Sequence, residues 1–249
     1  MTRPALFTGC LTAVMLAGAA GATDLTTMSD AEREAFRAEV RAYLIENPEV
    51  LVEAFNTLEQ RQAAEQAKGD AALVADNADA IFDDGTSWVG GNPDGDITLV
   101  EFVDYRCGYC RKAHDEVAEL IKSDGNIRFI VKEFPILGEQ SVHSARFALA
   151  VRQAAGDEVY KKAHDALITL KGDVNATSLT RLAGDLGLDA QDILARMESP
   201  EVSAVIAANH ELAGRMQISG TPTFVLGGQM VRGYVPLAGM REIVAEERG

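Results

Sequence analysis

Cysteine is scarce in this chain, and that scarcity limits its chemistry. Only Cys10, Cys107 and Cys110 occur in 249 residues. Small exported scaffolds that are held together by several disulfides are therefore excluded. A closed zinc site made of thiolates alone is also excluded within a single chain, because a structural zinc ion takes four ligands.

Positive charge is the second deficit. The chain has 23 Lys and Arg residues against 38 Asp and Glu residues, which gives a formal net charge of −15. Nucleic acids and anionic membrane surfaces bind through clustered positive charge, so this composition argues against both as partners. The acidity favours solubility and does not identify a substrate.

The first 22 residues predict an export signal rather than a folded element. Arg3 supplies the positive start, an apolar run extends from Ala5 to Ala20, and Ala20-Gly21-Ala22 is a cleavage site of the A-x-A type. The run is too short for a confident membrane span, which needs about 20 apolar residues. Cleavage near Ala22 removes Cys10 and one positive charge, so the net charge becomes −16. We therefore expect a periplasmic protein.

Residues 23–67 predict an N-terminal helical segment, interrupted at Asn47-Pro48. Apolar residues from Tyr43 to Leu58 recur at helical spacing, and the segment is too small to bury that face by itself. The face must either cover its own domain as a lid or pack against other copies of the chain. Residues 68–90, which contain Asp, Ala, Gly and several turn formers, are expected to be a linker.

Residues 91–249 predict a larger α/β domain. The nearly continuous apolar run Ile97–Val103 is typical of a strand that is covered on both faces. A strand, a helix and a second strand follow one another at the spacing of a right-handed crossover unit. Three phenylalanines are expected in the core: Phe134, Phe147 and Phe224. The predicted elements are a strand over Ile97–Val103, a helix from Cys107 to about Ser123, a strand over Ile127–Phe134, helices over residues 140–216, a hairpin of Thr223–Leu226 and Gln229–Val231, and a helix over Leu237–Glu247.

The sequence Cys107-Gly108-Tyr109-Cys110 carries the strongest chemical signal. Two thiols three residues apart at the start of a helix can close into a disulfide and reopen. A loop this short adds little stability through chain entropy, so a purely structural disulfide is the weaker interpretation. The unpaired N–H groups and the positive end of the helix dipole favour a thiolate at Cys107, the candidate nucleophile. Cys110, about one turn further on, is the candidate resolving thiol.

Several segments together resemble a known superfamily. The strand before the motif, the motif itself and the proline loop Ser219–Phe224 resemble the thioredoxin superfamily, and the long helical block before that loop resembles the inserted domain of DsbA-like proteins. Asp104–His114, Lys132–Gly138 and Arg41–Leu51 are most similar to the Com1-type and ScsC (suppressor of copper sensitivity) branch. The resemblance implies an α/β thioredoxin fold with a helical insertion at about 138–217 and an N-terminal helical extension.

The resemblance also implies roles for residues outside the motif. Glu101, six residues before Cys107, falls on the position of the family's buried acid, which is thought to take the proton of the resolving cysteine. Burial would raise its pKa and make it a usable base; a salt-bridged glutamate at a strand edge is the alternative. Thr221 and Pro222 fall on the family's cis-proline loop, where the backbone of the residue before proline pairs with substrate.

Other side chains near the cysteines refine this interpretation. Gly108-Tyr109 differs from the Pro-His of the strongest oxidants in the group, so no imidazole from this dipeptide faces the thiolate. We expect Tyr105 and Tyr109 to form part of an apolar substrate surface. His114, four residues after Cys110, would tune the pair, join it in binding a soft metal, or serve only in packing. Three histidines are interpreted as ordinary: His143, His164 and His210. Three flanking cations would stabilise the thiolate or be simply exposed: Arg106, Arg111 and Lys112.

The leading functional interpretation is an exported thiol–disulfide oxidoreductase, either an oxidase or an isomerase, acting on cysteine-containing exported proteins. This chemistry needs no cofactor and no resident metal ion. The resemblance favours a homo-oligomer through residues 29–67, which in turn favours isomerase activity, and we expect a membrane redox partner. The alternative is a module that binds copper or another soft metal through the same two thiols, because thiolates bind such ions well. A structural protein that only binds partners is the third interpretation.

Overall fold

The computed structural model describes residues 27–249, which fall into two compact units. One unit ends at Glu59 and the other extends from Gln60 to Gly249. The expected export signal, with Cys10 and the cleavage site near Ala22, lies outside the described residues. Across residues 27–249, no helix combines the length and the apolar character that a membrane span requires.

The first unit is helical, as the sequence predicts. Its first helix, α1 (Asp30–Glu46), starts at a capping box in which the Ser29 amide donates to Glu32 (2.8 Å) and the Glu32 amide donates to the Ser29 hydroxyl (3.4 Å). The helix ends at Glu46 with Asn47 as its C-cap, and α2 (Glu49–Asp76) begins after Pro48. No residue of α1 is buried. Large apolar side chains of this unit are exposed: Phe36, Val40, Tyr43, Ile45, Leu51, Val52, Phe55 and Leu58.

A mixed sheet of five strands forms the centre of the second unit, counting only the described residues. The strand order is β1-β3-β2-β4-β5, with β2 parallel to β3 and every other neighbouring pair antiparallel. The register places Glu101 between Val131 of β3 and Phe224 of β4. The strands are β1 (Trp88–Gly91), β2 (Ile97–Val103), β3 (Ile127–Glu133), β4 (Thr223–Leu226) and β5 (Gln229–Arg232).

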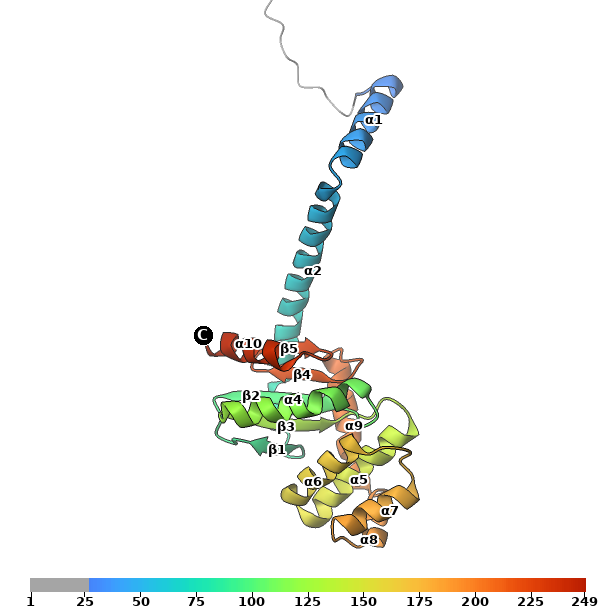
Figure 1. Ribbon diagram of the computed structural model, residues 1–249, viewed down its shortest axis with the longest axis vertical. Coiled ribbons are helices and arrows are strands. Elements are labelled where there is room, and N and C mark those ends of the chain that lie inside the picture. Colours follow the sequence, from blue (N-terminus) through green and yellow to red (C-terminus); the bar gives the residue numbers. More distant parts are fainter. Residues whose placement is uncertain (1–26) are drawn as a thin grey trace, which may run out of the picture. The chain divides into compact units, whose positions relative to one another are not determined.

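Both faces of this sheet are covered, which explains why β2 is almost entirely apolar. Leu99 and Phe129 belong to a core shared with α4 (Gly108–Asp124) and α10 (Leu237–Arg248), which contact each other. Figure 1 shows α4 lying across β2 and β3. Val100 and Ile130 belong to a second core, shared with α3 (Ala78–Phe82) and α9 (Pro200–Arg215).

A helical block is inserted between β3 and β4, within the predicted range of about 138–217. Its helices form a cluster beside the sheet (Figure 1). Asn175 and Ser199 cap two of them with side-chain oxygens that accept backbone N–H groups. The core prediction is confirmed for all three phenylalanines: Phe134, Phe147 and Phe224. Before α9, the inserted helices are α5 (Glu139–Ala155), α6 (Asp157–Thr169), α7 (Ala176–Asp185) and α8 (Ala190–Arg196).

Residues 68–90 are more regular than the linker that we expected. Helix α2 continues to Asp76, α3 follows, and β1 begins at Trp88. Alanine is the strongest helix former, so an alanine-rich polar stretch remains helical when part of it can pack. Val74 and Ile81 supply that packing in the second core. The segment therefore helps to cover the sheet.

Candidate functional site

The two cysteines are positioned by the junction between β2 and α4. Cys107 is the N-cap residue of α4, with extended backbone angles, and Cys110 lies in the first turn. Both are free thiols and both are buried. The Asp104 carboxylate, one residue after β2, accepts the backbone N–H groups of Arg106, Ile136 and Leu137 at 2.8, 2.8 and 3.0 Å. These bonds tie the loop before the motif to the loop after β3.

The environment of Cys107 stabilises its thiolate. A hydrogen bond from the Cys110 thiol is the largest cause that lowers the pKa of Cys107, to about 5, against the opposing effect of partial burial. Thr221 and the backbone N–H groups of Tyr109 and Cys110 add to the lowering. The amides are the unpaired donors that the start of a helix offers. A sulfur with this pKa is ionised at neutral pH.

Cys110 has the opposite character. Its pKa is raised, first by its hydrogen bond to Cys107, then by burial, and then by the charge of Glu101. The pair therefore consists of one ionised sulfur and one protonated sulfur in contact. This arrangement can form and reopen a disulfide once a base removes the second proton.

A buried carboxyl group lies close enough to Cys110 to affect its ionisation. Burial, together with the charges of Glu133 and Cys107, raises the pKa of Glu101 to about 8. Among the described residues, none donates a hydrogen bond to this carboxyl group. Glu101 lines a cavity of about 220 Å³ together with His114 and other residues. The alternative of a salt-bridged edge glutamate does not fit, because β2 is a central strand.

The proline loop lies beside the nucleophile, although the two are far apart in the sequence. The Thr221–Pro222 peptide bond is cis. The Cys107 sulfur lies 3.1 Å from the Thr221 carbonyl oxygen, to which only the protonated thiol can donate a hydrogen bond. The loop is held by two further bonds, from the Gly233 amide to the Pro222 carbonyl and from the Thr223 hydroxyl to the Gly220 carbonyl, both 2.9 Å.

The two tyrosines near the motif have different environments. Tyr109 is 62% exposed and stacks on Tyr234, with ring centroids 6.3 Å apart. The Tyr234 hydroxyl donates to Glu116 at 2.5 Å, and the Lys112 ammonium lies 4.1 Å from the Tyr234 ring centroid. Our expectation for Tyr105 was wrong, because this side chain is fully buried. Its aromatic ring suits a core position as well as a surface, and sequence alone does not distinguish the two.

Tyr105 belongs to a buried polar network that sequence reasoning missed. Its hydroxyl donates to Glu133 at 2.7 Å and lies 3.0 Å from Nδ1 of His164. Tyr160 donates to the same Glu133 oxygen at 2.6 Å. Burial raises the pKa of Glu133 to about 8, against the lowering effect of both hydroxyls, and burial lowers the pKa of His164 to about 3. The signal for this network in the sequence was Glu133, an acidic residue at the end of the buried, largely apolar strand β3.

The cations around the motif make other contacts. Arg106 donates to the Gly172 carbonyl at 3.0 Å, and Arg111 donates to the Tyr105 carbonyl at 2.9 Å. His114 packs between α4 and α6, with Nε2 3.2 Å from Asp165. The His114 side chain therefore contacts α6, through Asp165. Among the described residues, one group of side chains could hold a metal ion, and it combines His114 with His164 and Asp165.

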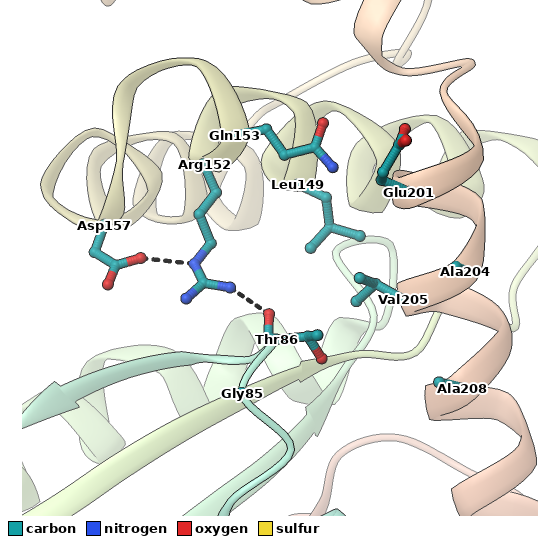
Figure 2. A pocket seen from close by; sticks show the side chains of 10 residues that line it. All are labelled: Gly85, Thr86, Leu149, Arg152, Gln153, Asp157, Glu201, Ala204, Val205 and Ala208. Atoms are coloured by element: carbon teal, nitrogen blue, oxygen red, sulfur yellow. Dashed lines mark hydrogen bonds and ion pairs between the residues drawn. The ribbon is translucent and has the colours of Figure 1, made fainter.

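A larger cavity of about 650 Å³ lies away from the cysteines. Figure 2 shows it between α5, α9 and the loop before β1, with Leu149 and Val205 pointing into it. At the edge of the cavity, the Arg152 guanidinium donates hydrogen bonds to the Asp157 carboxylate, at 2.6 Å, and to the Thr86 carbonyl. None of the residues predicted for the site lines this cavity.

Comparisons with known families agree with this geometry. Residues 98–245 match the DSBA-like thioredoxin domain, and residues 32–65 match the N-terminal domain of the copper resistance protein ScsC. These matches confirm the predicted thioredoxin fold with its helical insertion and the predicted similarity to the ScsC branch.

Solved structures extend the likeness over most of the chain. A thioredoxin-like oxidoreductase from Silicibacter pomeroyi is 42% identical, with a TM-score of 0.64 over 68% of this chain and 96% of that one. The thiol-disulfide exchange protein alpha-DsbA2 of Wolbachia pipientis is 28% identical, with a TM-score of 0.67 over 72% and 96%. ScsC of Proteus mirabilis in a transitional conformation is 26% identical, with a TM-score of 0.65 over 89% and 97%.

The likeness to one curated relative covers only part of each chain. The Na⁺/H⁺ antiporter NhaA 1 of Salinispora arenicola is 31% identical over 147 residues, which is 58% of this chain. The chain spans only 22% of the length of that antiporter. The match therefore concerns one segment of the relative.

Proposed function

The chain belongs to the DSBA-like thioredoxin domain family, and from that membership we propose that it is a thiol–disulfide oxidoreductase acting on exported proteins. The observation that carries the proposal is the ionised Cys107 sulfur, with a pKa of about 5, in contact with a protonated Cys110. A nucleophilic sulfur and a resolving thiol are the two groups that disulfide exchange requires.

The proposed exchange proceeds in two displacement steps. The Cys107 thiolate attacks one sulfur of a substrate disulfide, forms a mixed disulfide and releases the other substrate sulfur as a thiolate. Glu101 in its ionised form takes the proton of Cys110, and the new thiolate attacks Cys107, which forms the Cys107–Cys110 disulfide and releases the second substrate thiolate. The substrate gains two electrons and the pair loses two. Run in reverse, the same steps oxidise a substrate dithiol.

The proposed substrate contacts surround the reactive sulfur. Thr221 presents its backbone beside Cys107 at the proline loop, and Tyr109 offers an exposed aromatic ring next to it. Tyr234 extends that ring surface by stacking. An extended substrate segment with an apolar residue near its cysteine fits these groups, because backbone pairing and aromatic contact do not depend on a particular sequence.

Trapping of the mixed disulfide tests this assignment. A Cys110→Ser variant lacks the resolving thiol, so it should accumulate disulfide-linked complexes with a scrambled test substrate, whose wrong disulfides the Cys107 thiolate can attack. The Cys107→Ser variant, which retains one thiol, is the matched control and should accumulate few. Equal trapping by both variants would remove the proposed assignment of nucleophile and resolving residue.

We further propose that α1 and the first part of α2 mediate self-association. Eight large apolar side chains of the first unit are exposed, and Phe55 is 65% exposed. Apolar patches of this kind mark interaction surfaces. Several active sites in one assembly would favour isomerase activity, since a reduced site can attack a wrong disulfide and remain near it while it rearranges.

A charge placed on this face tests the association. Phe55→Glu should lower the mass in solution and slow the refolding of a scrambled substrate, while the reduction of a small disulfide is unchanged. Asn56→Asp adds a negative charge at the neighbouring exposed position and should leave the mass unchanged. An unchanged mass for Phe55→Glu would exclude this face as the contact.

The N-terminal signal pattern favours the periplasm, and a membrane redox partner would restore the pair after each turnover. Copper binding by the same thiols is a second candidate function, favoured by the match of residues 32–65 to a copper resistance family. Anaerobic titration of the reduced protein with Cu(I) distinguishes the two: a tight stoichiometric complex together with negligible disulfide exchange would favour metal handling.

A further inference from the structure

Two imidazoles and one carboxylate converge where α4 packs against α6. His114 comes from α4, and His164 and Asp165 come from α6. One donor atom from each of the three residues lies within 4.8 Å of the others. The imidazole centroids are 5.5 Å apart, and Nε2 of His114 is 3.2 Å from an Asp165 oxygen. Imidazole and carboxylate together suit borderline divalent ions such as Zn²⁺.

The buried network sets the tautomer of His164. Oε1 of Glu133 accepts hydrogen bonds from both Tyr105 and Tyr160, at 2.7 and 2.6 Å. The Tyr105 hydroxyl has then used its only hydrogen, so Nδ1 of His164, 3.0 Å away, is the donor to it. Nε2 of His164 keeps its lone pair and has no hydrogen-bond partner in the described part of the chain. Metal-binding histidines are commonly oriented in this way, by a hydrogen bond from the other ring nitrogen.

The surroundings leave room for an ion and for water. His114 and His164 both line the cavity of about 220 Å³, and a water molecule occupies about 30 Å³ of liquid volume. Glu101 and Lys122 line the same cavity. The cavity can therefore supply a fourth, exchangeable ligand.

The Lys161 ammonium group competes with a metal ion for the Asp165 carboxylate. The Lys161 ammonium lies 2.6 and 2.7 Å from the two carboxylate oxygens of Asp165. Its side chain is 38% exposed, so the ammonium group can move into solvent when another cation binds Asp165. This competition predicts an effect on affinity that a packing role for the cluster would not produce.

We propose that His114, His164 and Asp165 form a binding site for a borderline divalent metal ion, with Zn²⁺ as the probe. The fourth position is open to cavity water, and binding displaces Lys161 from Asp165. The site is separate from Cys107 and Cys110 and does not depend on the proposed exchange function.

Metal titration of the full chain, without an affinity tag, tests the site. Cys107→Ser and Cys110→Ser are combined as the parent protein, so that thiolates cannot bind the ion. Calorimetry should show one Zn²⁺ per chain, and Co²⁺ should give a visible spectrum of nitrogen and oxygen ligation. The absence of saturable Zn²⁺ binding to this parent would overturn the proposal.

Three further substitutions in the parent locate the ion. His114→Gln should weaken Zn²⁺ binding by more than about 100-fold, since loss of an outer-shell partner alone costs about 10- to 100-fold. Lys161→Met removes the competing ammonium group and should tighten Zn²⁺ binding by up to about fivefold, which corresponds to the free energy of an exposed ion pair. His143→Gln is the control: His143 lies on α5, 3.9 Å from Glu139 and outside the cluster, and its replacement should leave the Zn²⁺ affinity unchanged. Parent-like affinity in the properly folded His114→Gln variant, or no tightening in Lys161→Met, would show that the cluster serves only in packing.

Discussion

The Cys107 sulfur lies 3.1 Å from the backbone carbonyl oxygen of Thr221, a residue 114 positions later in the chain. The contact joins the start of α4 to the loop before β4. It places the reactive sulfur against a backbone segment that ends in a cis peptide bond. A substrate cysteine that reaches Cys107 must therefore pass beside the Thr221 backbone, which is why we propose that this backbone binds substrate.

Removing the Cys110 thiol should make Cys107 less acidic. The hydrogen bond from Cys110 is the largest cause of the low pKa of Cys107, so Cys110→Ala should raise that pKa from about 5 towards the ordinary value of 9.0. Cys110→Ser keeps a hydroxyl donor and should raise it less. The rate of alkylation measured against pH gives both values. Equal pKa values in the two variants and the parent would contradict this account of the thiolate.

The buried Glu101 carboxyl should make stability depend on pH in a defined window. Its pKa is raised from 4.5 to about 8 in the folded protein, so between these values the folded state holds a proton that the unfolded state has lost. The contribution of Glu101 to stability is therefore complete below pH 4.5 and is lost as the pH rises through about 8. Glu101→Gln should flatten this decline. Urea unfolding across the window measures it, with the exposed Glu242→Gln as a control that should leave the decline unchanged.

The hydroxyls that face Glu133 should contribute to stability. Tyr160→Phe removes a 2.6 Å hydrogen bond to a fully buried carboxyl group. Loss of a partner to a buried polar group costs about 1–3 kcal/mol. The free energy of unfolding should fall by this amount, and the pKa of Glu133 should rise further, because the Tyr160 hydroxyl lowers it. Tyr109→Phe, at an exposed ring, should change stability little; a comparable loss there would contradict the assignment.

A buried ion pair anchors the segment before β1. Nζ of Lys132 is fully buried and lies 2.6 Å from Asp84 and 2.8 Å from the Ala80 carbonyl. Lys132→Met should destabilise the protein by about 3–5 kcal/mol, because it leaves a partly buried carboxylate without its cation. The double variant with Asp84→Asn should lose less than the sum of the single losses. Additive losses in a double-mutant cycle would show that the two groups do not interact.

Local sequence patterns predicted the regular elements well wherever one pattern dominated. The apolar run Ile97–Val103 forms β2 with the predicted ends, and Asn47-Pro48 separates α1 from α2. Residues 68–82 were the main error, because their composition is that of a linker while their helices are stabilised by contacts of Val74 and Ile81 with the sheet. Those contacts join segments that are distant in the sequence, so no local pattern contains them.

The candidate site shows the same division. The spacing of Cys107 and Cys110 at a helix start is a local property, and it was sufficient to propose two thiols that can meet. The buried partners of Tyr105, and the cluster of His114 with His164 and Asp165, were not predicted. They come from α4, α6 and β3, and only the packing of these elements brings their side chains together.

The sequence by itself determined that two thiols stand one helical turn apart after a buried strand, because helix geometry depends on neighbouring residues. The sequence also indicated which sulfur is the nucleophile, and the tertiary structure decided how far burial raises the pKa of Glu101 and which loop lies beside Cys107. The physical reason is that a pKa responds to solvent exclusion and to charges and donors within a few ångströms. For Cys107 most of those neighbours are local, namely Cys110 and Tyr109, whereas Thr221 and the residues that bury Glu101 come from elements far along the chain.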